Sequence, residues 1–146
     1  MTNQRQEIVF DLSELPDVVE QVFLAARGRK KWTLTGEMGA GKTTFVQALC
    51  AFWRIDGRVS SPTYSLVNEY FFVEKTTQKQ QLVRHIDLYR LLKAQEAIDF
   101  GIEDYLYDDA YCLIEWADLI ADFLPENMFQ LRIEALDDGR RKISFS

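Results

Sequence analysis

The segment GEMGAGKTTF, residues 36–45, constrains this chain most, because it joins two apolar runs through three glycines, a lysine and two threonines. It matches the pattern G-x-x-x-x-G-K-[ST]. The preceding stretch KKWTLT (30–35) is typical of a strand. After the loop, apolar residues recur at helical spacing: Phe45, Val46, Leu49, Phe52 and Trp53. The sequence therefore predicts a strand, a glycine loop and a helix in succession, which is the context that this motif requires.

The residues of the loop suit phosphate chemistry. Glycines let backbone N–H groups approach phosphate oxygens closely, and the start of the next helix adds its positive end. Lys42 can reach the β- and γ-phosphates, and the Thr43 hydroxyl can ligate a Mg²⁺ ion that bridges them. A glycine-rich turn without a ligand is the alternative. The guanine-reading N-K-x-D element is missing from the sequence, so we expect ATP as the nucleotide.

Two carboxylates, Asp87 and Glu115, each close an apolar strand, in QLVRHIDLY and YCLIEW. Strand alternation puts His85 and Asp87 on one face. One acid would hold Mg²⁺ and the other would orient the attacking water, although residue order leaves open which does which. Each acid has a second interpretation as a helix cap or surface residue. We interpret His85 as a hydrogen-bonding brace rather than a proton shuttle.

The other segments predict an α/β fold, a three-layer P-loop NTPase-like mixed sheet flanked by helices. EIVFDL (7–12) is expected to be a strand, with Ser13 capping a helix that Gly28 ends. TYSLVNEYFFV and QLVRHIDLY should form an antiparallel hairpin after the loop helix, with Asp87 opposite roughly Asn68. LLKAQEAIDF and DLIADFL read as helices, and a second hairpin turns at DDG (137–139).

Composition narrows the classes of function. The 146 residues suit a single P-loop ATPase domain over residues 1–146, and a net charge of −6 argues against a broad nucleic-acid-binding surface. We expect little direct binding of tRNA. No apolar run approaches the roughly 20 residues that cross a bilayer, so we expect no membrane association and a cytoplasmic location. Cys50 and Cys112 lie in apolar runs and are expected to be reduced core residues.

Four motifs, in this order and at this spacing, resemble the TsaE (YjeE) family of bacterial ATPases: GEMGAGKTT, SPTYSLVNEY, HIDLYRL and LIEWAD. The resemblance covers about residues 12–145. It implies a small P-loop α/β fold and a role in making threonylcarbamoyladenosine in tRNA. By the same resemblance, ATP hydrolysis acts on the TsaD and TsaB proteins, driving turnover of their complex rather than carrying out the carbamoyl transfer.

The resemblance also implies roles for individual residues. Thr43 and Glu115 would bind Mg²⁺, and Asp87 would be a catalytic carboxylate that is also a candidate metal ligand. Phosphate binding falls to residues 36–44: Gly36, Glu37, Met38, Gly39, Ala40, Gly41, Lys42, Thr43 and Thr44. Further nucleotide contacts fall to Thr63, as a switch residue, and to Trp116, Arg140 and Glu14. The family commonly has Asp and Leu where this chain has Glu37 and Met38.

Two of these residues also have a purely structural interpretation. Trp116 is equally typical of a core aromatic residue, and Arg140 of a solvated hairpin. Two other functions share a phosphate loop, namely a small-molecule kinase and a nucleotide-sensing module that hydrolyses nothing. A kinase usually needs a lid carrying arginines, and no lid-like insertion is evident. Phosphate release to water distinguishes the ATPase from both.

Overall fold

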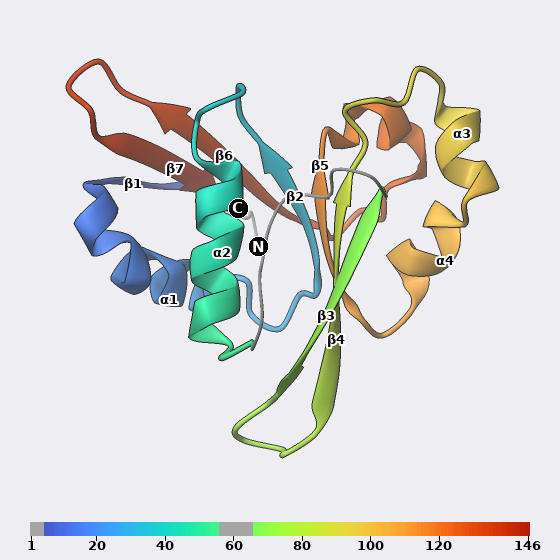
Figure 1. Cartoon of the computed structure of the whole chain (residues 1–146), viewed down its shortest axis with the longest axis horizontal. Helices are drawn as coiled ribbons and strands as arrows, with labels where there is room; N and C mark the ends of the chain where they lie inside the picture. The colour runs from blue at the N-terminus through green and yellow to red at the C-terminus, as the bar shows by residue number, and fades with distance from the viewer. Residues whose placement is uncertain (1–4, 56–65) are drawn as a thin grey trace.

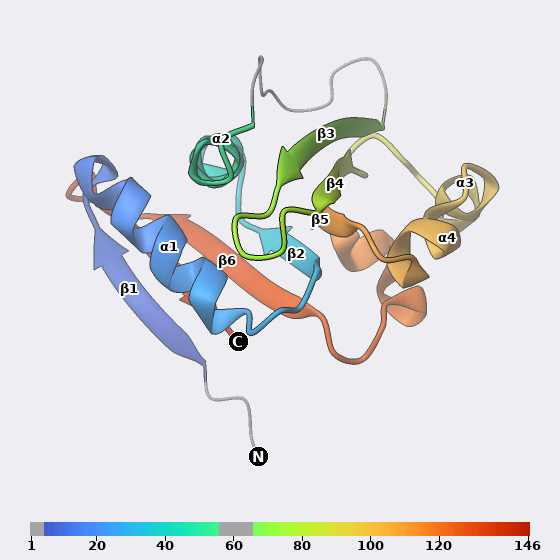
Figure 2. The same cartoon turned by 90° about the horizontal axis from the view of Figure 1, so that it is seen from below.

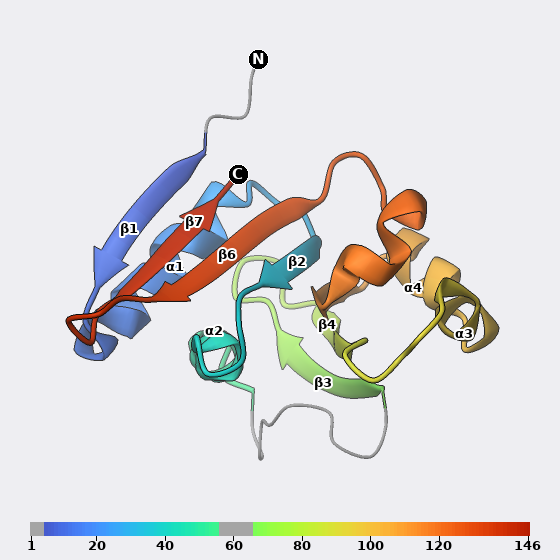
Figure 3. The same ribbon diagram turned by 90° about the horizontal axis from the view of Figure 1, so that it is seen from above.

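A seven-stranded mixed sheet forms the centre of the molecule in the computed structural model, which describes residues 5–55 and 66–146. The strand order is β1-β7-β6-β2-β5-β4-β3 (Figures 1 and 3). Neighbours among β6, β2, β5 and β4 run parallel, whereas β1, β7 and β3 join antiparallel. The strands are β1 Gln6–Phe10, β2 Lys31–Thr35, β3 Val67–Val73, β4 Gln80–Asp87, β5 Tyr111–Glu115, β6 Phe129–Ala135 and β7 Arg141–Phe145.

Helices cover the two faces of this sheet unequally (Figure 2). On one face lie α1 (Leu15–Ala25) and α2 (Lys42–Phe52), which follow a 3₁₀ turn, η1 (Leu12–Glu14), and the glycine loop respectively. On the other face α3 (Ala94–Asp99), α4 (Ile102–Tyr107) and the 3₁₀ segment η2 (Ala117–Phe123) cover β4 and β5. The fold is thus the predicted P-loop NTPase-like α/β sandwich with an antiparallel hairpin after α2.

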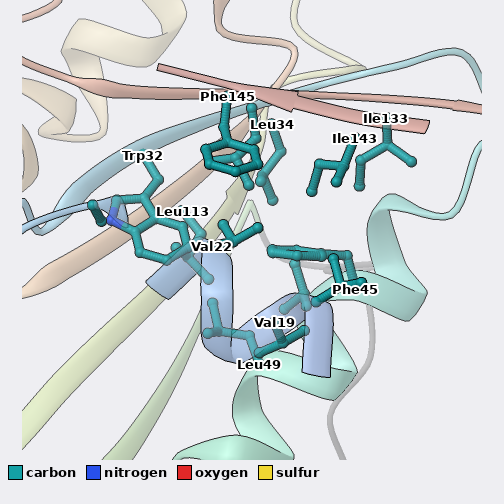
Figure 4. Close-up of a cluster of buried hydrophobic side chains, with 14 of the residues drawn as sticks. Val19, Val22, Trp32, Leu34, Phe45, Leu49, Leu113, Ile133, Ile143 and Phe145 are labelled. Carbon is teal, nitrogen blue, oxygen red and sulfur yellow. The ribbon is translucent and has the colours of Figure 1, made fainter. Parts of the chain in front are cut away.

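The larger core lies between the sheet and the pair α1–α2 (Figure 4). Each large side chain buried there stabilises the fold by about 1.5–3 kcal/mol, relative to leaving it exposed. The contributing residues are fully or almost fully buried and come from five elements: Val19, Val22, Trp32, Leu34, Phe45, Leu49, Ile133 and Ile143. Burial of Phe45 and Leu49 packs α2 against the sheet, with its first turn near the end of β2.

Alternation along β4 and β5 separates the two cores. Val83 and Leu113 belong to the α1–α2 side, whereas Ile86 and Ile114 belong to the α3–α4 side. His85 and Asp87 share the face of Val83, as predicted from the period of two. Glu115 shares the face of Leu113. The two acids therefore lie on the α2 side of the sheet, at the carboxyl ends of neighbouring strands.

Several local predictions need correction. Ser13 lies inside η1 and does not cap a helix, because α1 begins at Leu15 with Glu14 at the N-cap position. Asn68 pairs with His85, and Asp87 instead donates its backbone N–H to Leu66 O at 3.1 Å. The helix predicted in DLIADFL is present, and it is of the 3₁₀ type. The helix α4 was not predicted, since its six residues are too few for a clear period.

Two expectations about the rest of the chain can be checked. Cys50 and Cys112 are free and buried, and burial raises the pKa of each thiol to about 12. They are reduced core residues, as predicted. No described helix combines the length and the apolarity needed to cross a bilayer.

Candidate nucleotide and metal site

The glycine loop connects β2 to α2 at the carboxyl end of the parallel strands, at the top of Figure 1. Gly41 occupies the N-cap position of α2 with φ 110°, a left-handed conformation that favours glycine. Gly36 is needed for a different reason. A Cβ there would lie 2.6 Å from Ile133 O on β6, so only glycine lets the loop leave β2 so close to its neighbour.

Lys42 begins α2, and its ammonium is buried at the mouth of the loop. Its Nζ donates to Gly36 O at 2.6 Å and lies 4.0 Å from Glu115 Oε1. The same ammonium lies 4.2 Å from the centroid of the Trp116 ring. The lysine predicted to bind phosphate therefore meets one of the two predicted carboxylates, which comes from the adjacent strand β5.

Glu115 is buried at the end of β5 and is held from β4. Its Oε2 lies 2.6 Å from His85 Nε2, and the histidine is fully buried. His85 is therefore hydrogen-bonded within the site, as a brace would be, and its partner is Glu115 on the neighbouring strand.

Asp87 is the register partner of Glu115 across β4 and β5, so the two carboxylates lie side by side. Asp87 is half-buried and accepts the backbone N–H of Tyr89 at 3.0 Å. Burial raises the pKa of Asp87, and the neighbouring charge of Glu115 adds to this rise. The Tyr89 N–H, His85 and Lys42 lower the same pKa without cancelling it. This carboxyl group therefore holds its proton more tightly than an ordinary Asp.

The donors at this end of the sheet fit Mg²⁺. Thr43, the second residue of α2, is half-buried beside Lys42, and Asp87 and Glu115 supply carboxylate oxygens. All three are hard oxygen ligands of the kind that Mg²⁺ prefers. Within residues 5–55 and 66–146, no group of three or more His, Cys, Asp and Glu could hold a metal alone. Mg²⁺ sites commonly take one or two carboxylates and complete their shell with phosphates and water.

Trp116 follows the last residue of β5 in a left-handed conformation, with φ 59° and ψ 45°. Its half-buried ring packs 5.1 Å from the ring of Tyr89 and lies over Lys42. Trp116 also packs, half-buried, against the core on the α3–α4 side, so its interpretation as a core aromatic is confirmed in part. The indole in addition lies beside the loop lysine.

Glu14 and Arg140 lie on the other side of the glycine loop, near β1 and β7. Arg140 is exposed and pairs with Asp138, and this contact raises the pKa of Arg140. Asp11 and Glu14 contribute smaller effects in the same direction. Glu14 Oε1 accepts the backbone N–H of Asp11 at 3.0 Å. The two residues are thus within electrostatic range of each other, while their predicted contact with nucleotide stays a prediction.

The remaining predicted phosphate-binding residues follow the loop. Glu37 and Met38 are exposed at its tip, Thr44 is exposed on α2, and Ala40 is buried. The loop and the end of β6 line a hollow of about 250 Å³. Thr63 and the segment SSPT lie outside the described residues, so the switch assignment stays a prediction.

Arg141 is a residue at the loop that the sequence interpretation missed. Its Nε lies 3.7 Å from the position that a Cβ on Gly41 would take, and that nitrogen is buried without a hydrogen-bond partner among the described residues. Its Nη1 donates to Gly139 O at 3.1 Å. Side-chain alternation puts Arg141 and its neighbour Arg140 on opposite faces of a strand. Only the pairing of β7 with β1 and β6 brings Arg141 to the loop.

A family model described as threonylcarbamoyl adenosine biosynthesis protein TsaE matches residues 10–143. Similar proteins with the name tRNA threonylcarbamoyladenosine biosynthesis protein TsaE include one from Haemophilus influenzae, 40% identical over 107 residues. That match covers 73% of this chain and 64% of the other protein, so it spans less than two thirds of that relative.

Two further relatives extend the comparison. The protein of the same name from Aquifex aeolicus is 35% identical over 130 residues, covering 86% of this chain and 84% of its own. The crystal structure of YdiB from Bacillus subtilis superposes with a TM-score of 0.72 at 27% identity. It covers 97% of this chain and 84% of that chain. The likeness thus extends over the whole sheet and over the glycine loop.

Proposed function

The chain belongs to the TsaE family of threonylcarbamoyladenosine biosynthesis proteins, and on that premise we propose that it binds ATP with Mg²⁺ and hydrolyses the nucleotide. The observation that carries this proposal is the meeting of Lys42 with the end of β5, where its Nζ lies 4.0 Å from Glu115 Oε1. A phosphate-loop lysine beside a strand-end carboxylate is the arrangement that a Mg²⁺-nucleoside triphosphate requires.

Each residue has a role in this proposal. The backbone N–H groups of residues 36–44 and the Lys42 ammonium bind the β- and γ-phosphates, while Thr43 and Glu115 hold the metal. The Mg²⁺ ion, when bound, neutralises charge that develops on the phosphate oxygens. The Lys42 ammonium has three N–H donors and uses one of them on Gly36 O, which leaves two for oxygens of the β- and γ-phosphates.

Asp87 is proposed as the carboxylate that orients the attacking water and accepts its proton. Its raised pKa brings it closer to the operating pH than an ordinary Asp, which favours general-base catalysis. An alternative assignment makes Asp87 a second metal ligand beside Glu115. The two differ in outcome, because loss of a metal ligand weakens the dependence of binding on Mg²⁺ whereas loss of a base lowers turnover alone.

The nucleotide base is proposed to lie on the opposite side of the loop, toward Glu14 and Arg140. Trp116 and Thr63 complete the proposed site at the triphosphate end. For the pathway, we propose that hydrolysis acts on a complex of TsaD and TsaB and drives its repeated turnover. Direct tRNA binding by this acidic chain is expected to be weak, and nanomolar affinity at physiological salt in filter binding would contradict that.

Phosphate release measured with ATP and Mg²⁺, with and without TsaB and TsaD, tests the proposal. Glu115→Gln is expected to lower Mg²⁺-dependent hydrolysis by on the order of 100-fold or more, while nucleotide binding in EDTA persists. Normal turnover by this variant would refute the assignment of Glu115. Phosphate that appears only on a small-molecule acceptor would instead identify a kinase.

A further inference from the structure

His85 is a fully buried polar side chain of the site. The proposed binding and hydrolysis of ATP assign no role to it. Its Nε2 lies 2.6 Å from Glu115 Oε2. Its Nδ1 is buried with no hydrogen-bond partner among the described residues. Among the described residues, therefore, Glu115 is the one hydrogen-bond partner of this imidazole.

Stability of the fold does not account for a histidine at this position. Two neighbours on the same face, Val83 on its own strand and its register partner Leu113 on β5, are buried and apolar, whereas its register partner Asn68 on β3 is polar. A ring nitrogen buried there without a partner costs stability, whereas an apolar side chain would pack without that cost. The benefit of the histidine has to lie in what it does to Glu115.

The two oxygens of Glu115 face different groups. Oε2 is taken by His85, and Oε1 points toward Lys42, 4.0 Å from Nζ. A carboxylate that binds a metal only accepts hydrogen bonds, so in that role of Glu115 the donor between the two residues would be His85 Nε2. The terminal torsion of a Glu side chain is broad. A short bond to one oxygen fixes the plane of the carboxylate and so the direction of the other oxygen.

We propose that His85 is a positioning residue, which holds Glu115 with Oε1 turned toward Lys42 and the phosphate loop, where ATP-bound Mg²⁺ would meet it. This inference rests on the proposed function, because Glu115 has to be a metal ligand for its orientation to matter. Partners that orient a metal ligand typically change metal affinity when they are replaced, although they never touch the metal.

Binding of Mn²⁺ to the full chain with a non-hydrolysable ATP analogue, followed by the electron paramagnetic resonance signal of free Mn²⁺, tests the proposal without turnover. His85→Leu is expected to weaken Mn²⁺ binding by about 10- to 100-fold, with unchanged binding of the analogue in EDTA. His85→Gln retains a terminal N–H donor and is expected to recover much of the Mn²⁺ affinity. A merely structural role predicts no such recovery.

Two results would overturn the inference: Mn²⁺ affinity unchanged in His85→Leu, or equal losses in the Leu and Gln variants. If His85→Leu fails to fold, His85→Gln decides alone, since a donor at Nε2 predicts near wild-type Mn²⁺ affinity and its loss contradicts the proposal. Glu115→Gln is the matched control. If this variant also keeps its Mn²⁺ affinity, the proposed metal site itself is wrong, and this result is distinct from a failure of His85 alone.

Discussion

The central strands carry charged side chains at both ends, and the two ends differ in how completely these charges are paired. The amino-end cluster consists of Lys31, Glu69, Arg84 and Asp108. Lys31 Nζ donates to Asp108 Oδ1 at 2.8 Å and to the carbonyls of Tyr105 and Ala110 at 2.8 and 2.6 Å. Arg84 bonds to Asp108 and Glu69. Each charge there meets an opposite charge within the cluster.

The carboxyl-end cluster consists of Lys42, His85, Asp87 and Glu115, and its charges are less well matched. Two carboxylates lie on paired positions of β4 and β5, while the ammonium donates to a backbone carbonyl. The pKa values of the two aspartates reflect this contrast. Burial acts to raise both, but hydrogen bonds from Lys31, Ala110 and Arg84 hold the pKa of Asp108 below its ordinary value, whereas that of Asp87 stays raised.

The comparison shows which end supports the fold and which is available for a ligand. A cluster whose charges already have partners gains little from binding an ion. Two adjacent carboxylates, and a lysine held by a carbonyl, leave the carboxyl end suited to a cation and a phosphate. Ligand sites at the carboxyl ends of strands are also the rule for open α/β sheets.

The largest contrast is expected between the two lysines. Lys42→Ala should lower ATP turnover by on the order of 1,000-fold and weaken ATP binding, because the phosphates lose their charged donor. Lys31→Ala should lower the free energy of unfolding by about 2 kcal/mol through three lost hydrogen bonds, with ATP affinity unchanged. Calorimetric titration with ATP and urea unfolding measure the two effects. Loss of ATP affinity in Lys31→Ala would remove the distinction between the ends.

The two aspartates provide the next test. Asp87→Asn is expected to lower turnover by on the order of 100-fold, as loss of a general base does, without lowering the free energy of unfolding, because folding disfavours the Asp87 charge. Asp108→Asn is expected to cost about 1 kcal/mol of stability, a value reduced for solvent screening, and to leave turnover intact. Phosphate release and chemical denaturation measure both variants, and a reversed pattern would contradict the comparison.

The smallest effect is in the acid dependence of stability. The pKa of Asp108 is lowered from 3.8, so its stabilising contribution is present above 3.8 and is lost as pH falls through the lowered value. The pKa of Asp87 is raised from 3.8, so the folded state loses stability as pH rises from 3.8 through the raised value. Carboxyl-carbon NMR should show Asp87 titrating above 3.8 and Asp108 below it. The opposite order would contradict the charge environments described above.

Local features of the site were predictable because they depend on neighbours in the chain. The glycine loop, the strand before it and the stripe of α2 are contiguous, and alternation alone put His85 and Asp87 on one face. The pairing of β3 with β4 was also predictable, although its register was not. Asp87 faces Leu66 rather than Asn68, a shift of two residues that keeps every side chain on its face, so alternation alone does not distinguish the two registers.

Contacts between segments far apart in the chain could not be predicted from local sequence patterns. Sequence patterns did not show that His85 would bond to Glu115, or that Arg141 rather than Arg140 lies against Gly41. The 3₁₀ form of residues 117–123 and the short helix α4 were also missed. Both depend on packing against β5 and β4, where tertiary contacts outweigh weak local preferences.

The order of residues by itself determined that this chain has a phosphate-type loop between a strand and a helix, because glycine conformation and helical period are properties of adjacent residues. Only the tertiary structure decided that β5 lies beside β2 and β4, which brings Glu115 to Lys42 and His85. Strand order is set by the joint burial of two apolar faces, to which residues from the whole chain contribute, so no single segment encodes it.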